Sequence, residues 1–142
     1  MQIAGPLRVR LQLLGWLALI IATGLVWRKA DLGLPFFFWK YGGSALWGAM
    51  VFVIVRIVKP YAPIKTTLAA SALIAIAVEI SRLYETPALD EFRLTLAGQL
   101  LLGRIFSLWN LVAYAVGIAG AAGTLKFAGT IRLSRTGRSS VE

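Results

Sequence analysis

Four long apolar segments limit the fold of this chain more than any other feature. They cover residues 11–27, 37–58, 64–84 and 105–125. A helix that crosses a bilayer needs about 20 mostly apolar residues, within a range of about 17–25. The sequence therefore predicts an all-α membrane protein, a bundle of four transmembrane helices. The first segment is expected to stay as an anchored helix, because no small-residue cleavage site of a signal peptide follows it.

The composition supports this fold class and a single domain. Of the 142 residues, 58% are hydrophobic and only 15% are charged, whereas soluble domains are about half apolar and about a quarter charged. We expect one transmembrane helical domain over residues 1–128 and a basic, disordered cytoplasmic tail over residues 129–142. The net charge of +9 is assigned to residues that flank the spans. No nucleic acid is expected as a partner, since no basic stripe with interleaved aromatic residues is present.

The absence of two residue types narrows the chemistry. The chain has no cysteine and no histidine, which excludes disulfides, thiol nucleophiles and the common zinc sites. No cofactor and no metal are expected. Catalysis would rest on residues such as Glu79, Lys40 or Ser44, and no nucleophile–base spacing is visible, so enzyme activity is the least favoured class of function.

A shorter apolar segment lies between the third and fourth spans. Residues 94–103 read LTLAGQLLLG, which is too short to cross a bilayer. We expect a short re-entrant or interfacial helix here. Thr86 and Pro87 are expected to break the third helix before it.

The distribution of basic residues predicts the orientation. With four spans, both termini lie on the same side, and the positive-inside rule places the more basic side in the cytoplasm. The terminal side has nine basic residues, against six on the other side. The nine are Arg8, Arg10, Arg56, Lys59, Lys65, Lys126, Arg132, Arg135 and Arg138. We therefore expect both termini to be cytoplasmic.

A single carboxylate near the end of the third span raises the main functional question. Glu79 follows the uncharged run TTLAASALIAIAV. A buried carboxylate costs several kcal/mol unless it is paired. Arg82, three residues later on the same helical face, is a local candidate partner, and Arg93 is a second. The structural alternative is an ion pair with no further role.

Other polar residues are expected at the same depth, near the outer face. Asn110 and Tyr114 share one face of the fourth span, and Lys40 and Ser44 share one face of the second. Snorkelling, hydrogen bonds between helices and an interfacial aromatic belt are the structural alternatives. The candidate ligand-binding residues are Lys40, Tyr41, Ser44, Glu79, Arg82, Arg93, Asn110 and Tyr114.

Small residues recur along the fourth span. Gly117, Gly120 and Gly123 give a smooth helix surface. Close helix packing is predicted, rather than a phosphate-binding loop, because no strand precedes the glycines.

Several of these motifs together resemble a known family. Residues 40–47, KYGGSALW, and residues 78–84, VEISRLY, are two of them, and Arg93 and Asn110 belong to later ones. In order and spacing they resemble domain of unknown function 2809, a family of small bacterial membrane proteins similar to the VanZ-like proteins of the cell envelope. The resemblance spans about residues 27–117. It implies a multi-pass protein of the bacterial plasma (inner) membrane and supplies no reaction.

Two positions depart from the family pattern. Arg82 stands where the resemblance implies glutamine, and Asn110 where it implies aspartate. Both differences move charge in the positive direction within one expected site. A proton relay through position 110 is therefore disfavoured.

Three functions follow from these features. The first is a site for an envelope lipid or its headgroup near the outer face, with arginine and lysine side chains holding a phosphate. The second is a small oligomeric transporter that uses Glu79. The third is an assembly subunit of a larger membrane complex. Membrane lipids are the expected partners, with a homo-oligomer or a larger membrane protein as alternatives.

Overall fold

Each long apolar segment forms a continuous helix in the computed structural model, which describes residues 4–103 and 105–136. Two shorter helices lie between the third and fourth long ones, and the described residues contain no strand. The all-α class and the four long helices are thus confirmed. The helices are α1 (Ala4–Lys29), α2 (Phe36–Val58), α3 (Ile64–Ser81), α4 (Pro87–Leu94), α5 (Leu96–Leu101) and α6 (Leu108–Thr136).

The four long helices have the length and composition of membrane spans. The qualifying stretches are Leu7–Lys29, Phe36–Val58, Ile64–Ser81 and Leu108–Ala128. Large apolar side chains such as Leu73 and Val116 are exposed on the outside of the bundle. A helix that is apolar on all sides is suited to a lipid environment. The chain is therefore a multi-pass membrane protein.

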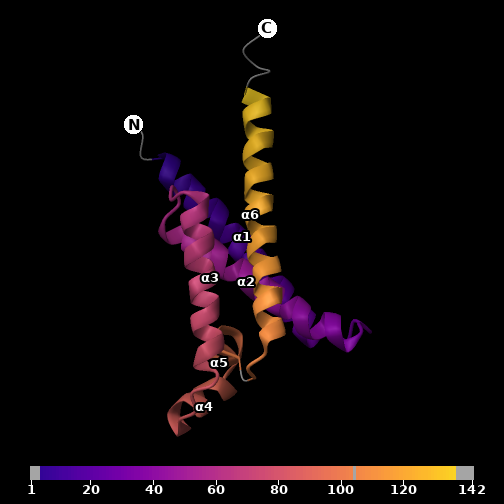
Figure 1. Ribbon diagram of the computed structural model, residues 1–142. Helices are drawn as coiled ribbons and strands as arrows, with labels where there is room; N and C mark the ends of the chain where they lie inside the picture. The colour runs from indigo at the N-terminus through magenta and orange to yellow at the C-terminus, as the bar shows by residue number, and fades with distance from the viewer. Residues whose placement is uncertain (1–3, 104, 137–142) are drawn as a thin grey trace.

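Helix α2 organises the bundle, because α1, α3 and α6 all pack against it. Phe52 and Val53 of α2 are buried in a core with Ala75 of α3 and with Tyr114 and Ile118 of α6. The start of α1 and the end of α6 lie at the same end of the bundle, and α4 and α5 lie at the other end (Figure 1). We call these the terminal end and the distal end.

Helix α1 is the least buried of the four. Only 6% of its spanning stretch is buried inside the protein, against 22% for each of the other three. It packs on α2 and crosses α6 at an angle (Figure 1). Much of its surface is left for lipid or for a ligand.

The third helix is shorter than predicted. It ends at Ser81 and not at Tyr84, because the amides of Arg82, Leu83 and Tyr84 bond three residues back, as in a 3₁₀ turn. Thr86 and Pro87 therefore do not break this helix. They begin α4, where the Thr86 side chain accepts a hydrogen bond from the Leu89 amide and proline occupies the first turn.

The segment 94–103 is not one helix. Leu94 closes α4, and Thr95 caps α5 by accepting a hydrogen bond from the Gly98 amide. Gly103 then turns the chain toward α6 with a positive φ of 65°, which favours glycine. Short helices between the third and fourth long ones are thus confirmed, as two helices in place of one.

The fourth long helix differs from the prediction at both ends. It begins at Leu108 and continues to Thr136, so residues 129–136 of the expected disordered tail are helical. Residues 137–142, the rest of that tail, lie outside the described part.

Glycine allows α2 and α6 to approach closely. A side chain at Gly48 would collide with the Tyr114 backbone, and one at Gly117 would collide with the Ala45 carbonyl. The close packing predicted for Gly117 is therefore present. Gly120 and Gly123 differ, since a Cβ atom at either would meet nothing within 4 Å.

Gly117→Ala is expected to lower the free energy of unfolding by about 1–3 kcal/mol, because the added methyl group forces the two helices apart. Thermal unfolding in detergent measures the effect. Gly123→Ala, on the same helix in open space, is the matched control. It is expected to be neutral or slightly stabilising, since alanine is the better helix former. Equal losses in both variants would contradict this packing.

Candidate functional site

Glu79 lies on the buried face of α3. The buried residues of this helix are Thr67, Ser71, Ala75 and Glu79, which recur every four residues and so share one face. This face packs against α2 and α6. Glu79 is 0% exposed, so its carboxylate must find partners inside the protein.

Four hydrogen bonds satisfy the Glu79 carboxylate. Oε1 accepts from the Ser107 amide at 2.7 Å and from Asn110 Nδ2 at 3.2 Å. Oε2 accepts from Arg82 Nη1 at 2.6 Å and from Tyr114 Oη at 2.9 Å. All four neighbours are placed as donors, so both carboxylate oxygens have their hydrogen-bond partners inside the protein. The network formed by Glu79 and these donors is called the Glu79 network below.

The Glu79 network lies at the first turn of α6. Ser107 directly precedes this helix, and its carbonyl accepts from the Asn110 amide. The first amides of a helix lack partners within the helix and carry a partial positive charge. Glu79 supplies the anion that such a terminus attracts. The carboxylate therefore joins the end of α3 to the start of α6.

Arg82 extends this connection to the chain between α5 and α6. Its Nε donates to the Leu102 carbonyl at 2.5 Å, and its Nη1 also donates to the Ile105 carbonyl at 3.2 Å. The guanidinium packs so closely on Gly103 that a Cβ there would collide with it. Arg82 thus neutralises Glu79 and holds the linker in place.

Arg93 has partners of its own and does not pair with Glu79. It is 3% exposed and donates to the carbonyls of Ser81 at 2.6 Å and Tyr84 at 3.0 Å. It also forms an ion pair with Asp90 at 3.0 Å. Its buried Nε has no partner among the described residues. Arg93 thus joins α4 to the last residue of α3 and to the turn that follows it.

The three candidates from α2 divide into two groups. Ser44 Oγ donates to Asn110 Oδ1 at 3.1 Å and so reaches the Glu79 network through Asn110. Lys40 Nζ lies 5.2 Å from the ring centroid of Tyr41 and 5.9 Å from that of Phe36. Of the eight candidates, the structure brings together Ser44, Glu79, Arg82, Asn110 and Tyr114, and it places Lys40, Tyr41 and Arg93 elsewhere.

Several groups in or next to the Glu79 network carried no signal in the sequence. The Ser107 amide and the carbonyls of Leu102 and Ile105 are backbone groups, which every residue type supplies. Trp47 was also missed. Its ring lies 4.7 Å from that of Tyr114, and its buried Nε1 has no partner within the described ranges.

No metal-binding cluster accompanies these residues. Within residues 4–103 and 105–136, no three Asp or Glu side chains come together as metal ligands. In the Glu79 network, the Glu79 carboxylate is held in place by four hydrogen bonds and is paired with Arg82.

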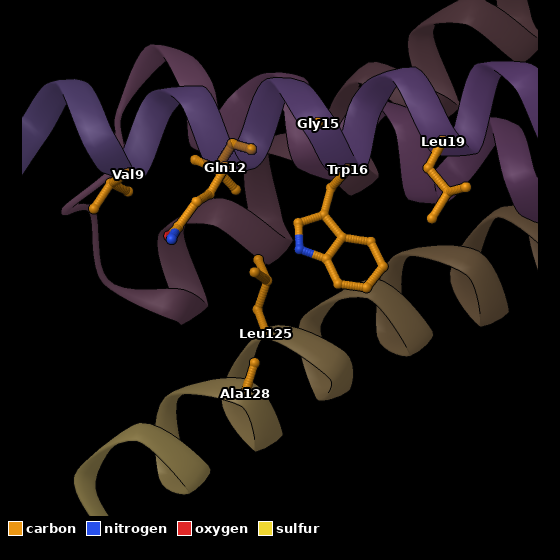
Figure 2. Close-up of a pocket in the computed structure, with 8 residues that line it drawn as sticks. Val9, Gln12, Gly15, Trp16, Leu19, Leu125 and Ala128 are labelled. Carbon is orange, nitrogen blue, oxygen red and sulfur yellow. The ribbon is translucent and has the colours of Figure 1, made fainter. Parts of the chain in front are cut away.

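A second candidate site is an apolar groove between α1 and α6, with α2 as its floor. A hollow of about 430 Å³ runs along Trp16 and Trp27 of α1, Gly42 and Ala49 of α2, and Gly120 of α6. A second hollow of about 510 Å³ continues it toward the terminal end. Figure 2 shows this second part, with Trp16 extending toward Leu125 and Gln12 pointing into the space. We call the two hollows together the lateral groove.

These features define a multi-pass membrane protein with an internal carboxylate network and a groove along its side. The sequence matches the model of the family described as Protein of unknown function (DUF2809) over residues 34–118. The match covers more than half of the chain, so the protein belongs to this family. No solved structure matches it. The relation to VanZ-like proteins stays a prediction.

The matched residues contain the Glu79 network and only part of the lateral groove. Residues 34–118 include α2 to α5 and the first part of α6. Helix α1, which forms one wall of the groove, lies before the match. The family match therefore covers only part of the groove.

Glu79→Gln is expected to lower the free energy of unfolding by about 3–5 kcal/mol, because it leaves the Arg82 guanidinium without its buried counter-ion. The new amide also places a donor against other donors. Unfolding in a denaturing detergent measures the loss. Glu91→Gln, at an exposed position of α4, is the matched control and is expected to leave stability unchanged.

A double-mutant cycle tests whether Tyr114 acts through the same carboxylate. Tyr114→Phe alone is expected to cost about 1.5–3 kcal/mol, since it removes a hydrogen bond to a charged group. Combined with Glu79→Gln, it is expected to cost less than the sum of the two. Wild-type stability of Glu79→Gln, or strict additivity, would contradict the network.

Proposed function

We propose that this protein binds a membrane lipid, whose acyl chain occupies the lateral groove. The observation that carries this proposal is the groove itself. Its walls are almost entirely apolar and include small residues such as Ala49, Gly120 and Ala121, and a Cβ atom at Gly120 would meet nothing within 4 Å. Its two hollows, of about 430 and 510 Å³, are each within the range of about 300–1,000 Å³ typical of small-molecule sites.

A slender chain suits the groove better than a helix of a partner protein. One helical turn is 5.4 Å long and about 10 Å across, so it occupies on the order of 400 Å³. Each hollow therefore has about the volume of one turn, so a membrane-spanning helix of five or more turns would lie mostly outside the groove. An acyl chain fills a narrow groove of this kind and needs no polar partners along its length.

The Glu79 network supports this function indirectly. It fixes the first turn of α6 against α3, and α6 forms one wall of the groove. Arg82 and Arg93 donate to internal acceptors, which favours a positioning role for them over direct contact with a headgroup.

The two other functions have less support. A transporter driven by protons requires Glu79 to exchange protons with water, whereas its carboxylate is 0% exposed and is bonded by four donors of the protein itself. An assembly subunit would use the same groove for a partner helix. Such a helix is larger than the two hollows together.

Gly120→Phe is expected to reduce lipid retention at least tenfold, because the ring fills the groove from a position where a Cβ atom meets nothing within 4 Å. Native mass spectrometry of protein released from detergent micelles measures the fraction that keeps a lipid.

Gly123→Phe is the matched control for this experiment. It adds the same ring to the same helix, in open space and outside the groove lining. It is expected to retain lipid as the wild type does. Equal retention in both variants would contradict the proposal, and a protein dimer or a bound partner in place of lipid would support the assembly subunit.

We also propose that the protein lies in the plasma (inner) membrane of a bacterium with both termini in the cytoplasm. The excess of basic residues on the terminal side supports this orientation. It places the Glu79 network near the outer face.

Reporter fusions test this orientation. Alkaline phosphatase fused after Glu142 is expected to be inactive, and the same enzyme inserted at Gly33 between α1 and α2 is expected to be active. Green fluorescent protein at the same two points should give the opposite pattern. An active phosphatase at the C-terminus would reverse the orientation.

A further inference from the structure

The two ends of the lateral groove differ in polarity. Toward the distal end its lining is Trp27, Gly42 and other apolar or small residues, and the hydroxyls of its two threonines, Thr23 and Thr124, are bonded to carbonyls of their own helices. Toward the terminal end it includes Gln12, whose side chain points into the hollow (Figure 2). A ligand that matches this lining is apolar along most of its length and polar at one end.

A basic residue lies next to the polar end. Arg8 is four residues before Gln12, and therefore one turn away on the same side of α1. It is exposed, and it is the second residue of the spanning stretch Leu7–Lys29. A residue at the start of a spanning stretch is expected at the depth of lipid headgroups, and Gln12 lies about 6 Å further along the helix axis at 1.5 Å per residue.

Two basic residues of the distal end, Lys29 and Lys40, do not lie on the helix faces that line the groove. Lys40 lies two residues before Gly42 and so on another side of α2. Its ammonium is already placed over the rings of Phe36 and Tyr41. Lys29 lies two residues after Trp27 and likewise on another side of α1.

We infer that the lateral groove selects an anionic lipid from the leaflet at the terminal end. The Arg8 guanidinium contacts the headgroup phosphate, the Gln12 amide donates to the ester region, and the acyl chain runs toward Trp27. This inference rests on the proposed function and adds the class of the lipid and its direction. Arginine is suited to the role because its planar guanidinium binds phosphate oxygens in pairs.

The matched test compares two arginines of α1. Arg8→Gln removes the charge beside Gln12. Arg10→Gln removes a charge two residues from Gln12, on the opposite side of the helix. Both positions are exposed, so neither change is expected to disturb the fold, and net charge falls equally in the two variants.

Each variant is titrated in detergent with dioleoyl phosphatidylglycerol and, separately, with dioleoyl phosphatidylcholine, and native mass spectrometry counts bound lipid. The wild type is expected to prefer the anionic lipid about fivefold, equivalent to about 1 kcal/mol for one basic residue at the membrane surface. Arg8→Gln is expected to bind the two lipids equally. Arg10→Gln is expected to keep the preference.

The outcomes separate this inference from the proposed function. If Gly120→Phe abolishes retention of both lipids while Arg8→Gln keeps the fivefold preference, the groove binds lipid and the inference is wrong. The same holds if Arg8→Gln and Arg10→Gln lose the preference equally, since net charge would then be the cause. If Gly120→Phe retains both lipids, the proposed function and the inference both fail. Glycerol phosphate without acyl chains is expected not to compete, and competition by it would indicate a phosphate site in place of a lipid site.

Discussion

The neutralisation of one carboxylate inside an apolar bundle determines how this protein holds together. Glu79 is fully buried, and an uncompensated charge at such a position costs several kcal/mol. Its donors come from the end of α3, from the residue before α6 and from the first turns of α6. A single side chain thus links two helices that are far apart in the sequence.

The link between α3 and α6 also affects the lateral groove, because α6 forms one of its walls. Helix α6 is held at its start by the Glu79 network and along its length by close contact with α2 at Gly48 and Gly117. Helix α1 packs on α2 and crosses α6 at an angle (Figure 1). The space between α1 and α6 is the lateral groove, so the groove follows from how α6 is held.

The side chains of the candidate site could be predicted from the sequence where a buried Glu79 needs polar partners at a suitable spacing. Arg82, at helical spacing from Glu79, and the facing pair Asn110 and Tyr114 all join the Glu79 network. Arg93 does not, because its guanidinium donates to the carbonyls of Ser81 and Tyr84 and pairs with Asp90 instead. The backbone donors and acceptors of the network could not be predicted, because every residue carries the same ones.

The sequence by itself determined the four spans, the short elements after the third, and the need for a partner at Glu79. These follow from local hydropathy and from the cost of a charge in lipid, which depend on residues near one another in the chain. Only the tertiary structure decided which donors surround the carboxylate, where Lys40 lies and that a groove opens along α1. The angles between packed helices depend on contacts such as Gly117 with Ala45, which join residues far apart in the sequence.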